Sequence, residues 1–181
     1  GVNCLAGVPS IVFGLFGLGL FVVFLQFGPS ILSGSLTLGI LILPTIIGAS
    51  EEALKGVPQT FREASLALGV SKWQTIYRIV LPNALPGILT GSILGIGRAA
   101  GETAPIMFTA AAFFTAKLPS SIFDEVMALP FHVYVLATAG THIEATRPIQ
   151  FGTVLVLVGL VLAVDLVAIV IRGTIRKRKR W

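Results

Sequence analysis

The sequence has very little charge. Only 12% of its 181 residues are charged, about half of the ~25% found in ordinary soluble domains. Residues 1–50 contain no Asp, Glu, Lys or Arg, and 55% of the chain is hydrophobic. This composition excludes a soluble enzyme domain, and it excludes a disordered chain because disorder requires low hydrophobicity and high charge. Uncharged apolar runs of about 18 or more residues predict membrane helices instead. The predicted fold class is therefore an all-α, polytopic membrane protein.

Cysteine pairs and metal-ligand clusters are also missing. The single Cys4 excludes a disulfide framework. His132 and His142 have no cysteine or carboxylate at metal-ligand spacing, so no metal site is predicted. The sequence contains no glycine-rich phosphate loop of the P-loop kind and no catalytic dyad. We therefore do not expect an enzyme, and any ATP chemistry must come from another chain.

Four segments are apolar and long enough to cross a bilayer. A helix rises ~1.5 Å per residue, so ~20 residues cover the ~30 Å hydrocarbon core. A turn at residues 28–30 separates the first two segments, and Pro44 predicts a kink in the second. Residues 105–148 are too polar after Ala116 to span, and we expect a loop there with a short helix around 131–139. The predicted spans are about 9–28, 32–50, 84–104 and 149–171.

The distribution of basic residues predicts the orientation. Six of the 13 lie in the tail 172–181 and four in the loop 51–82, whereas the opposite side has only Lys117 and Arg147. Because cytoplasmic loops are enriched in Lys and Arg, this loop and the C-terminus are predicted to be cytoplasmic, and segment 117–147 external. The basic tail is expected to anchor the topology and touch anionic lipid rather than nucleic acid.

The loop 60–82 carries signals for two short helices. Thr60 with Glu63, and Ser71 with Gln74, each fit a capping box, in which the first residue caps the helix and the residue three positions later reaches back. Gly69 stands where a helix would end in the left-handed conformation. With Pro82 as the expected stop, the predicted helices cover about 61–68 and 72–80.

The second of these helices is predicted to be amphipathic. Its apolar residues recur at positions i, i+3, i+4 and i+7, and on the first helix three residues share one side. Such a face either fills a groove on a partner or packs only against the protein's own spans. The residues are Trp73, Ile76, Tyr77 and Val80 on the second helix, and Phe61, Ala64 and Leu68 on the first.

Seven residues of this loop, at fixed spacing, resemble the EAA loop of ABC importer permeases. Ser65 stands where that family has a second alanine. The resemblance implies a coupling helix that docks into a cleft on a cytoplasmic ATPase subunit and transmits its motion to the spans. The residues are Glu63, Ala64, Ser65, Gly69, Ile79, Leu81 and Pro82.

The third predicted span combines a small-residue stripe with two charges. Small residues recur every four positions, which lets helix backbones approach closely in lipid. Arg98 and Glu102 lie on the same face at ~100° per residue, so both are expected to point into the bundle. Either Arg98 meets an anion in transit, with Glu102 holding it or lowering its affinity, or the pair only locks helix packing. The stripe is Gly87, Gly91, Gly95 and Ala99.

Three further segments resemble phosphate-transport permeases of the PstA type, in the MetI-like family: residues 6–15 (AGVPSIVFGL), 97–105 (GRAAGETAP) and 127–130 (MALP). The resemblance implies a permease subunit of an ATP-driven phosphate importer in a bacterial or archaeal cytoplasmic (inner) membrane. Its implied partners are a second permease, a dimer of ATP-binding subunits and an external phosphate-binding protein. No cofactor is expected on this chain, and ATP–Mg would bind the partner ATPase. The implied path residues are Arg98, Glu102 and Thr103.

Two other functions are compatible with the same features. One is an ABC permease for another anion, such as sulfate or molybdate. The other is an ATP-independent channel or secondary transporter, for which a capped two-helix loop would have no role. Because the family has two more spans upstream, we expect the chain to be truncated at its N-terminus.

Three acidic residues outside the motifs have separate predictions. Asp165, in the fourth span, is expected to pair with a donor on a neighbouring helix or to face a cavity. Asp124 and Glu125 are expected to be solvated external charges that could touch a binding protein.

Overall fold

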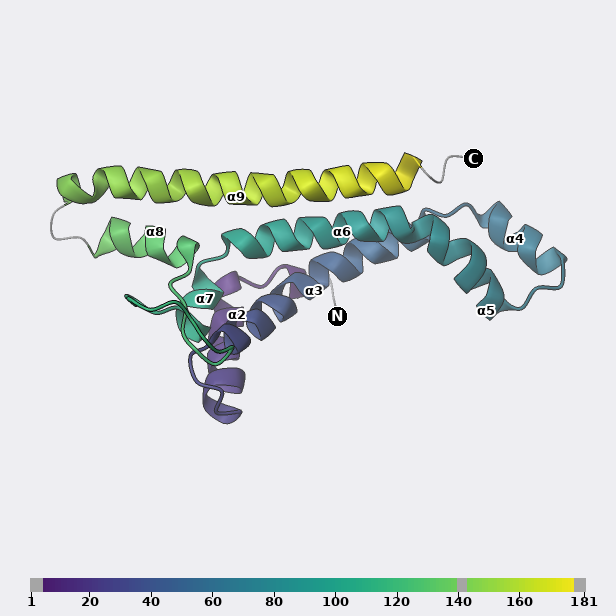
Figure 1. Cartoon of the computed structure of the whole chain (residues 1–181). Coiled ribbons are helices and arrows are strands. Elements are labelled where there is room, and N and C mark those ends of the chain that lie inside the picture. The colour runs from purple at the N-terminus through teal and green to yellow at the C-terminus, as the bar shows by residue number, and fades with distance from the viewer. Residues whose placement is uncertain (1–4, 140–142, 178–181) are drawn as a thin grey trace.

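The computed structural model describes residues 5–139 and 143–177, and over this part of the chain it is helical (Figure 1). The only β-structure in these ranges is an isolated bridge between Ala111 and Val126. The predicted all-α class is therefore confirmed. The elements are α2 (Ser10–Gly17), η1 (Leu18–Phe24, a π-helix), α3 (Ile31–Lys55), α4 (Gln59–Ala67), α5 (Lys72–Thr75), η2 (Ile76–Val80, a π-helix), α6 (Leu81–Gly101), α7 (Ala104–Thr109), α8 (Leu129–Thr138) and α9 (Ile143–Lys177).

Three helices in the described ranges are long and apolar enough to cross a membrane: α3, the continuous helix Lys72–Gly101, and Thr146–Val170 within α9. The first predicted span, about 9–28, is shorter in the structure, where α2 and η1 end at Phe24. The reason is local, because Gln26 and Gly28 have φ values of 56° and 67° in the left-handed region. The chain reverses there before α3 begins.

The third span also ends earlier than predicted. Residues 84–104 were expected to be helical, but α6 stops at Gly101 and Glu102 is extended, with φ −76° and ψ 128°. A helix continued through Pro105 would lose the hydrogen bond from that residue to the carbonyl of Gly101, because proline has no N–H. The chain instead starts a separate short helix, α7.

Helices α3 and α6 pack closely along the small-residue stripe. A Cβ atom placed on Gly87 would lie 2.5 Å from the Cβ of Ala53, and one placed on Gly91 would clash with Ala49. One on Gly95 would lie 3.2 Å from the side chain of Ile46. Ala99 is half-buried. The glycines therefore allow a backbone approach that larger residues would prevent.

The remaining helices are arranged around this pair (Figure 1). Helix α9 runs alongside α6, while α2 and α7 lie at one end of the pair and α4 and α5 extend from the opposite end. The two features singled out in the sequence thus lie at opposite ends. The hairpin loop projects from one end, and the charged break after α6 lies near the other.

The close approach predicts a selective effect of alanine. Gly91→Ala should destabilise the protein by about 1–3 kcal/mol, because the new methyl group overlaps the Ala49 Cβ in a packed contact. Gly39→Ala is the matched control, since a Cβ on Gly39 in α3 meets nothing within 4 Å. The control should be neutral or slightly stabilising, because alanine favours helix by ~1 kcal/mol over glycine. Thermal unfolding in detergent would measure both, and equal effects would contradict the packing.

Candidate coupling loop and translocation site

The hairpin formed by α4 and α5–η2 covers residues 59–80. It shows some of the helix start and stop signals that the sequence predicted. Gly69 has φ 78°, so it adopts the left-handed conformation expected at the end of the first helix. Ser71 caps the second helix, and its Oγ accepts a hydrogen bond from the backbone N–H of Gln74 at 3.3 Å. The two-helix arrangement of this loop is therefore observed.

Two local predictions about the hairpin were wrong. Thr60 does not cap the first helix, because α4 begins at Gln59 after Pro58 and has no side-chain cap. The restricted φ of Pro58 starts the helix earlier and places Thr60 inside its first turn. Pro82 does not end the second helix, which continues through the π-helix η2 into α6. Pro82 is the second residue of α6, just after η2, so its missing N–H falls where the helix changes from π-helical to α-helical hydrogen bonding.

Hydrogen bonds hold the hairpin to itself and to α3. The hydroxyl oxygens of Ser65 and Thr75 are 2.9 Å apart and both residues are buried, so this bond joins α4 to α5. Arg62 Nη2 donates to the carbonyl of Leu54 at 2.7 Å and ties α4 to the end of α3. The serine in the EAA-like motif therefore has a structural role, and Thr75 is a residue that sequence reasoning missed.

The apolar face of the second helix is divided. Val80 is 3% exposed and packs with Val57 and Ala84, whereas Trp73 and Tyr77 are 79% and 73% exposed. The π-helical turn in η2 changes the residues-per-turn spacing, so Val80 leaves the predicted stripe. Two large aromatic side chains at the end of the hairpin thus have no packing surface on the described part of the chain.

The motif residues differ in exposure. Ser65 is buried, while Glu63 and Ala64 face outward on α4. Ile79, Leu81 and Pro82 are half-buried where the hairpin joins α6. The exposed apolar residues nearest the turn are Leu68, Trp73, Ile76 and Tyr77, together with Phe61 and Leu66 on α4.

At the far end of α6, the predicted charges form an ion pair beside a helix break. Arg98 Nε donates to Glu102 Oε1 at 3.2 Å, with side-chain exposures of 45% and 17%. No other ion pair of Arg98 occurs in the described ranges. Thr103 is half-buried directly after the break. Only Nε of the Arg98 guanidinium is bonded to Glu102, so its two Nη groups have no partner among the described residues.

Helix α7, which the sequence did not predict, fixes the chain beyond this break. Pro105 and Thr109 are buried, and the carbonyl of Thr109 accepts a hydrogen bond from the N–H of Ser30 at 2.9 Å. A Cβ on Gly14 would lie 3.0 Å from the carbonyl oxygen of Ala104, so α2 also approaches α7 closely. Broken helices of this kind line ion and substrate sites in membrane transporters.

Asp165 of α9 faces α6. A Cβ placed on Gly97 would lie 2.6 Å from Asp165 Oδ1, so the half-buried carboxylate occupies a space that only glycine leaves open. No hydrogen bond or ion pair of Asp165 occurs among the described residues. The sequence predicted that Asp165 pairs with a donor on a neighbouring helix or faces a cavity. The structure instead places its carboxylate against the α6 backbone at Gly97, the residue before Arg98.

The segment before α8 is ordered around Asp124. Its carboxylate accepts hydrogen bonds from the backbone N–H of Ser120 at 2.8 Å and of Ser121 at 2.9 Å, and these bonds lower the pKa of Asp124. The N–H of Ile31 donates to the carbonyl of Asp124 at 3.0 Å, so the loop covers the start of α3. Asp124 is therefore a structural residue rather than only a solvated charge, while Glu125 is exposed.

The sequence predicts no metal site at the two histidines. His132 is half-buried in α8. His142 and residues 178–181 of the basic tail lie outside the described residues.

Comparison with known proteins places these features in a family. The family described as "Binding-protein-dependent transport system inner membrane component" matches residues 2–181. The chain belongs to this family. The resemblance found in the sequence is thus confirmed, and the helices that are long enough to span belong to an inner membrane transport component.

Several members of this family are similar to the chain over most of its length. "Phosphate transport system permease protein PstA 1" of Mycobacterium tuberculosis is 41% identical over 180 residues, which are 99% of this chain and 57% of that protein. "Probable ABC transporter permease protein YqgI" of Bacillus subtilis is 38% identical, covering 92% and 60%. "Phosphate transport system permease protein PstA" of Xylella fastidiosa is 37% identical, covering 91% and 56%.

The chain therefore spans less than two thirds of the length of these relatives. No solved structure matches it.

The bond between Ser65 and Thr75 predicts an asymmetric double-mutant cycle. Thr75 also donates to the carbonyl of Ser71 at 3.1 Å, so Ser65→Ala should cost about 1 kcal/mol or less. Thr75→Val should cost about 1–3 kcal/mol, because it leaves the buried Ser65 hydroxyl without its cross-helix partner. The double variant should be more stable than Thr75→Val alone. Thermal unfolding and amide exchange in residues 59–80 would measure the cycle, and additive losses would contradict the bond.

Proposed function

We propose that this chain is part of the permease subunit of an ATP-driven importer of inorganic phosphate. The observation that carries the proposal is the hairpin, which is fastened to α3 and α6 yet presents Trp73 and Tyr77 to the outside. Large exposed aromatic groups on a rigid support are typical of protein interfaces. The names of the phosphate-transport relatives supply the proposed substrate.

The proposed partner at this surface is a dimer of cytoplasmic ATP-binding subunits, which would hold ATP–Mg. The EAA-like residues would form the docking element, with Glu63 and Ala64 facing outward and Ser65 locking the two helices together. The helix that begins at Lys72 continues without interruption to Gly101. A displacement of the hairpin would therefore be carried along α6 toward Arg98.

The proposed anion path passes the break after α6. The exposed part of the Arg98 guanidinium suits an oxyanion, because its planar fork offers parallel donors. Glu102 competes for the same group and would keep the anion from binding too tightly to leave. Thr103 lies at the same break. We place the hairpin and the C-terminus on the cytoplasmic side of a bacterial or archaeal inner membrane, with a second permease beside this chain and a phosphate-binding protein outside.

The coupling proposal predicts the effect of removing the aromatic tip. In a complete reconstituted importer, the double change Trp73→Ala and Tyr77→Ala should weaken association with the ATP-binding subunit at least about 30-fold, as for interface hot spots. ATP-dependent phosphate uptake should fall with it. Leu118→Ala is the matched control, since Leu118 is 92% exposed in the loop before α8.

Unchanged association of the aromatic variant would reject the docking surface. Uptake by the wild-type complex without ATP would reject the importer and favour a channel or secondary transporter. Transport of sulfate or molybdate but not phosphate, with the matching binding protein, would reassign the substrate.

A second comparison separates the two interpretations of the ion pair. If Arg98 contacts the anion, Arg98→Ala should reduce uptake at least tenfold, whereas Glu102→Gln should retain or increase it, because only the first change removes the donor. If the pair only holds the fold, both changes should reduce uptake and thermal stability alike. Phosphate uptake and unfolding temperature of the two variants distinguish these results.

A further inference from the structure

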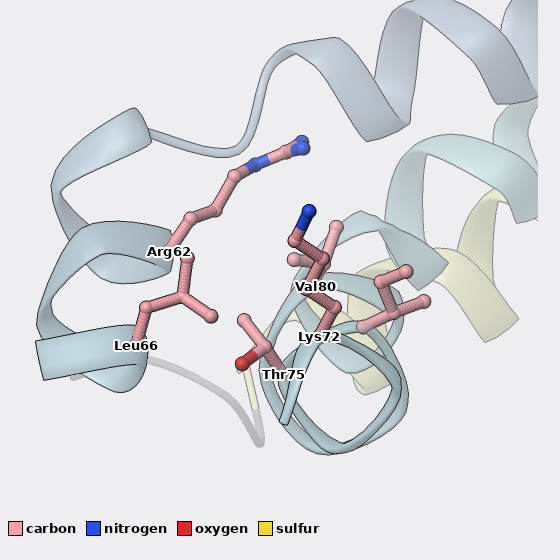
Figure 2. A pocket seen from close by; sticks show the side chains of 6 residues that line it. Arg62, Leu66, Lys72, Thr75 and Val80 are labelled. Carbon is pink, nitrogen blue, oxygen red and sulfur yellow. The ribbon is translucent and has the colours of Figure 1, made fainter. Parts of the chain in front are cut away.

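An open, largely apolar cavity of about 190 Å³ lies between α4 and α5–η2 of the hairpin (Figure 2). Two basic side chains from different helices line it, Arg62 from α4 and Lys72 from α5. Figure 2 shows their nitrogen-bearing ends on one side of the cavity and Thr75 on the other. Its other lining residues are Leu66, Ile76 and Val80.

The two cations have no acidic partner in the described part of the chain. Arg62 donates through Nη2 to the neutral carbonyl of Leu54, while its buried Nε has no hydrogen-bond partner. Lys72 forms no ion pair, and the neighbouring acid Glu63 pairs with neither of them. Two basic side chains therefore border one small, largely apolar cavity without an acidic partner, and an incoming anion at its rim would supply that partner.

The walls indicate what kind of anion fits. Three of the lining side chains are aliphatic, and the hydroxyl of Thr75 is already bonded to Ser65 and to the carbonyl of Ser71. A free inorganic phosphate would leave several of its oxygens against apolar groups, which is costly. A glutamate or aspartate side chain matches better, because its methylene stem can touch the aliphatic wall while its carboxylate meets the cations.

We propose that this cavity receives a carboxylate side chain of the ATP-binding subunit, an inference that rests on the proposed function and deepens it. Residues 56–82 contain three basic residues and one acidic residue, so the charge of the hairpin complements an acidic partner. Leu66 and Ile76, which line the cavity, are among the exposed apolar residues near the turn, so the cavity opens onto the same surface as Trp73. The carboxylate bridges α4 and α5 and fixes the hairpin in its docked form.

Lys72 is the residue to change, because Arg62 also holds the fold through Leu54. In the complete complex, Lys72→Gln should weaken binding of the ATP-binding subunit about tenfold and reduce the salt dependence of association. Lys72→Arg should restore both. Lys55→Gln is the matched control, since the Lys55 amine is exposed and already paired with Glu51 at 2.7 Å, and it should change neither.

Zero-length carbodiimide coupling tests the contact directly. In the assembled complex it should join the Lys72 amine to an Asp or Glu of the ATP-binding subunit, identified by mass spectrometry. The product should be absent from Lys72→Arg, whose guanidinium does not form this amide.

Wild-type affinity and salt dependence in Lys72→Gln, with no Lys72 cross-link, would overturn the proposal. If the aromatic variant still failed to associate, the docking surface itself would stand. If the aromatic variant and Lys72→Gln both associated like the wild type, the docking surface would be rejected as well, whereas the importer itself is tested by the ATP requirement of uptake. Lys72-dependent binding of inorganic phosphate to the permease, without any effect on subunit affinity, would assign a small-anion site and reject the carboxylate.

Discussion

The close approach of α3 and α6 is the contact on which the other features depend. Lipid supplies no hydrophobic force to hold helices together, so packing of small side chains has to do so. Glycines on α6 meet alanine and isoleucine side chains on α3 along one line, and this line sets the direction of both helices. The carbonyl of Leu54, near the end of α3, accepts a hydrogen bond from Arg62 of α4. The position of α4 therefore also depends on the packing of α3 against α6. The α4–α5 hairpin and the charged break are thus placed by one packed helix pair.

The two ends of this pair are connected differently. Toward the α4–α5 hairpin, α6 is continuous with α5 through a π-helical turn, and the bond between Ser65 and Thr75 closes the hairpin. Toward the ion pair, the helix stops at Gly101, and α7 is held by α2 and by the start of α3. A rigid element therefore leads from the aromatic tip to a place where the backbone changes direction.

Local chemistry in the sequence was enough to predict much of this arrangement. Gly69 and Ser71 act within one turn of their own positions, so their roles could be predicted without knowing the fold. The first span, the continuation past Pro82 and the existence of α7 could not be predicted this way. The length of the first span depends on a reversal at two left-handed residues, and α7 depends on contacts with helices distant in sequence. The contact between Asp165 and Gly97 could not be predicted either, because the two residues are far apart in the sequence and only the fold brings them together.

Few positions of helix α6 can accept a larger residue. Gly91 on one side and Gly97 on another both face atoms that leave no room for a methyl group. Substitutions that the lipid would accept are thus confined to the two arcs between these sides, and at ~100° per residue the exposed Leu94 and Ile96 lie on different arcs. A complete mutational map of this helix would show two intolerant stripes separated by permissive ones, and the widths of the permissive stripes would outline the surface left to lipid or to a neighbouring protein.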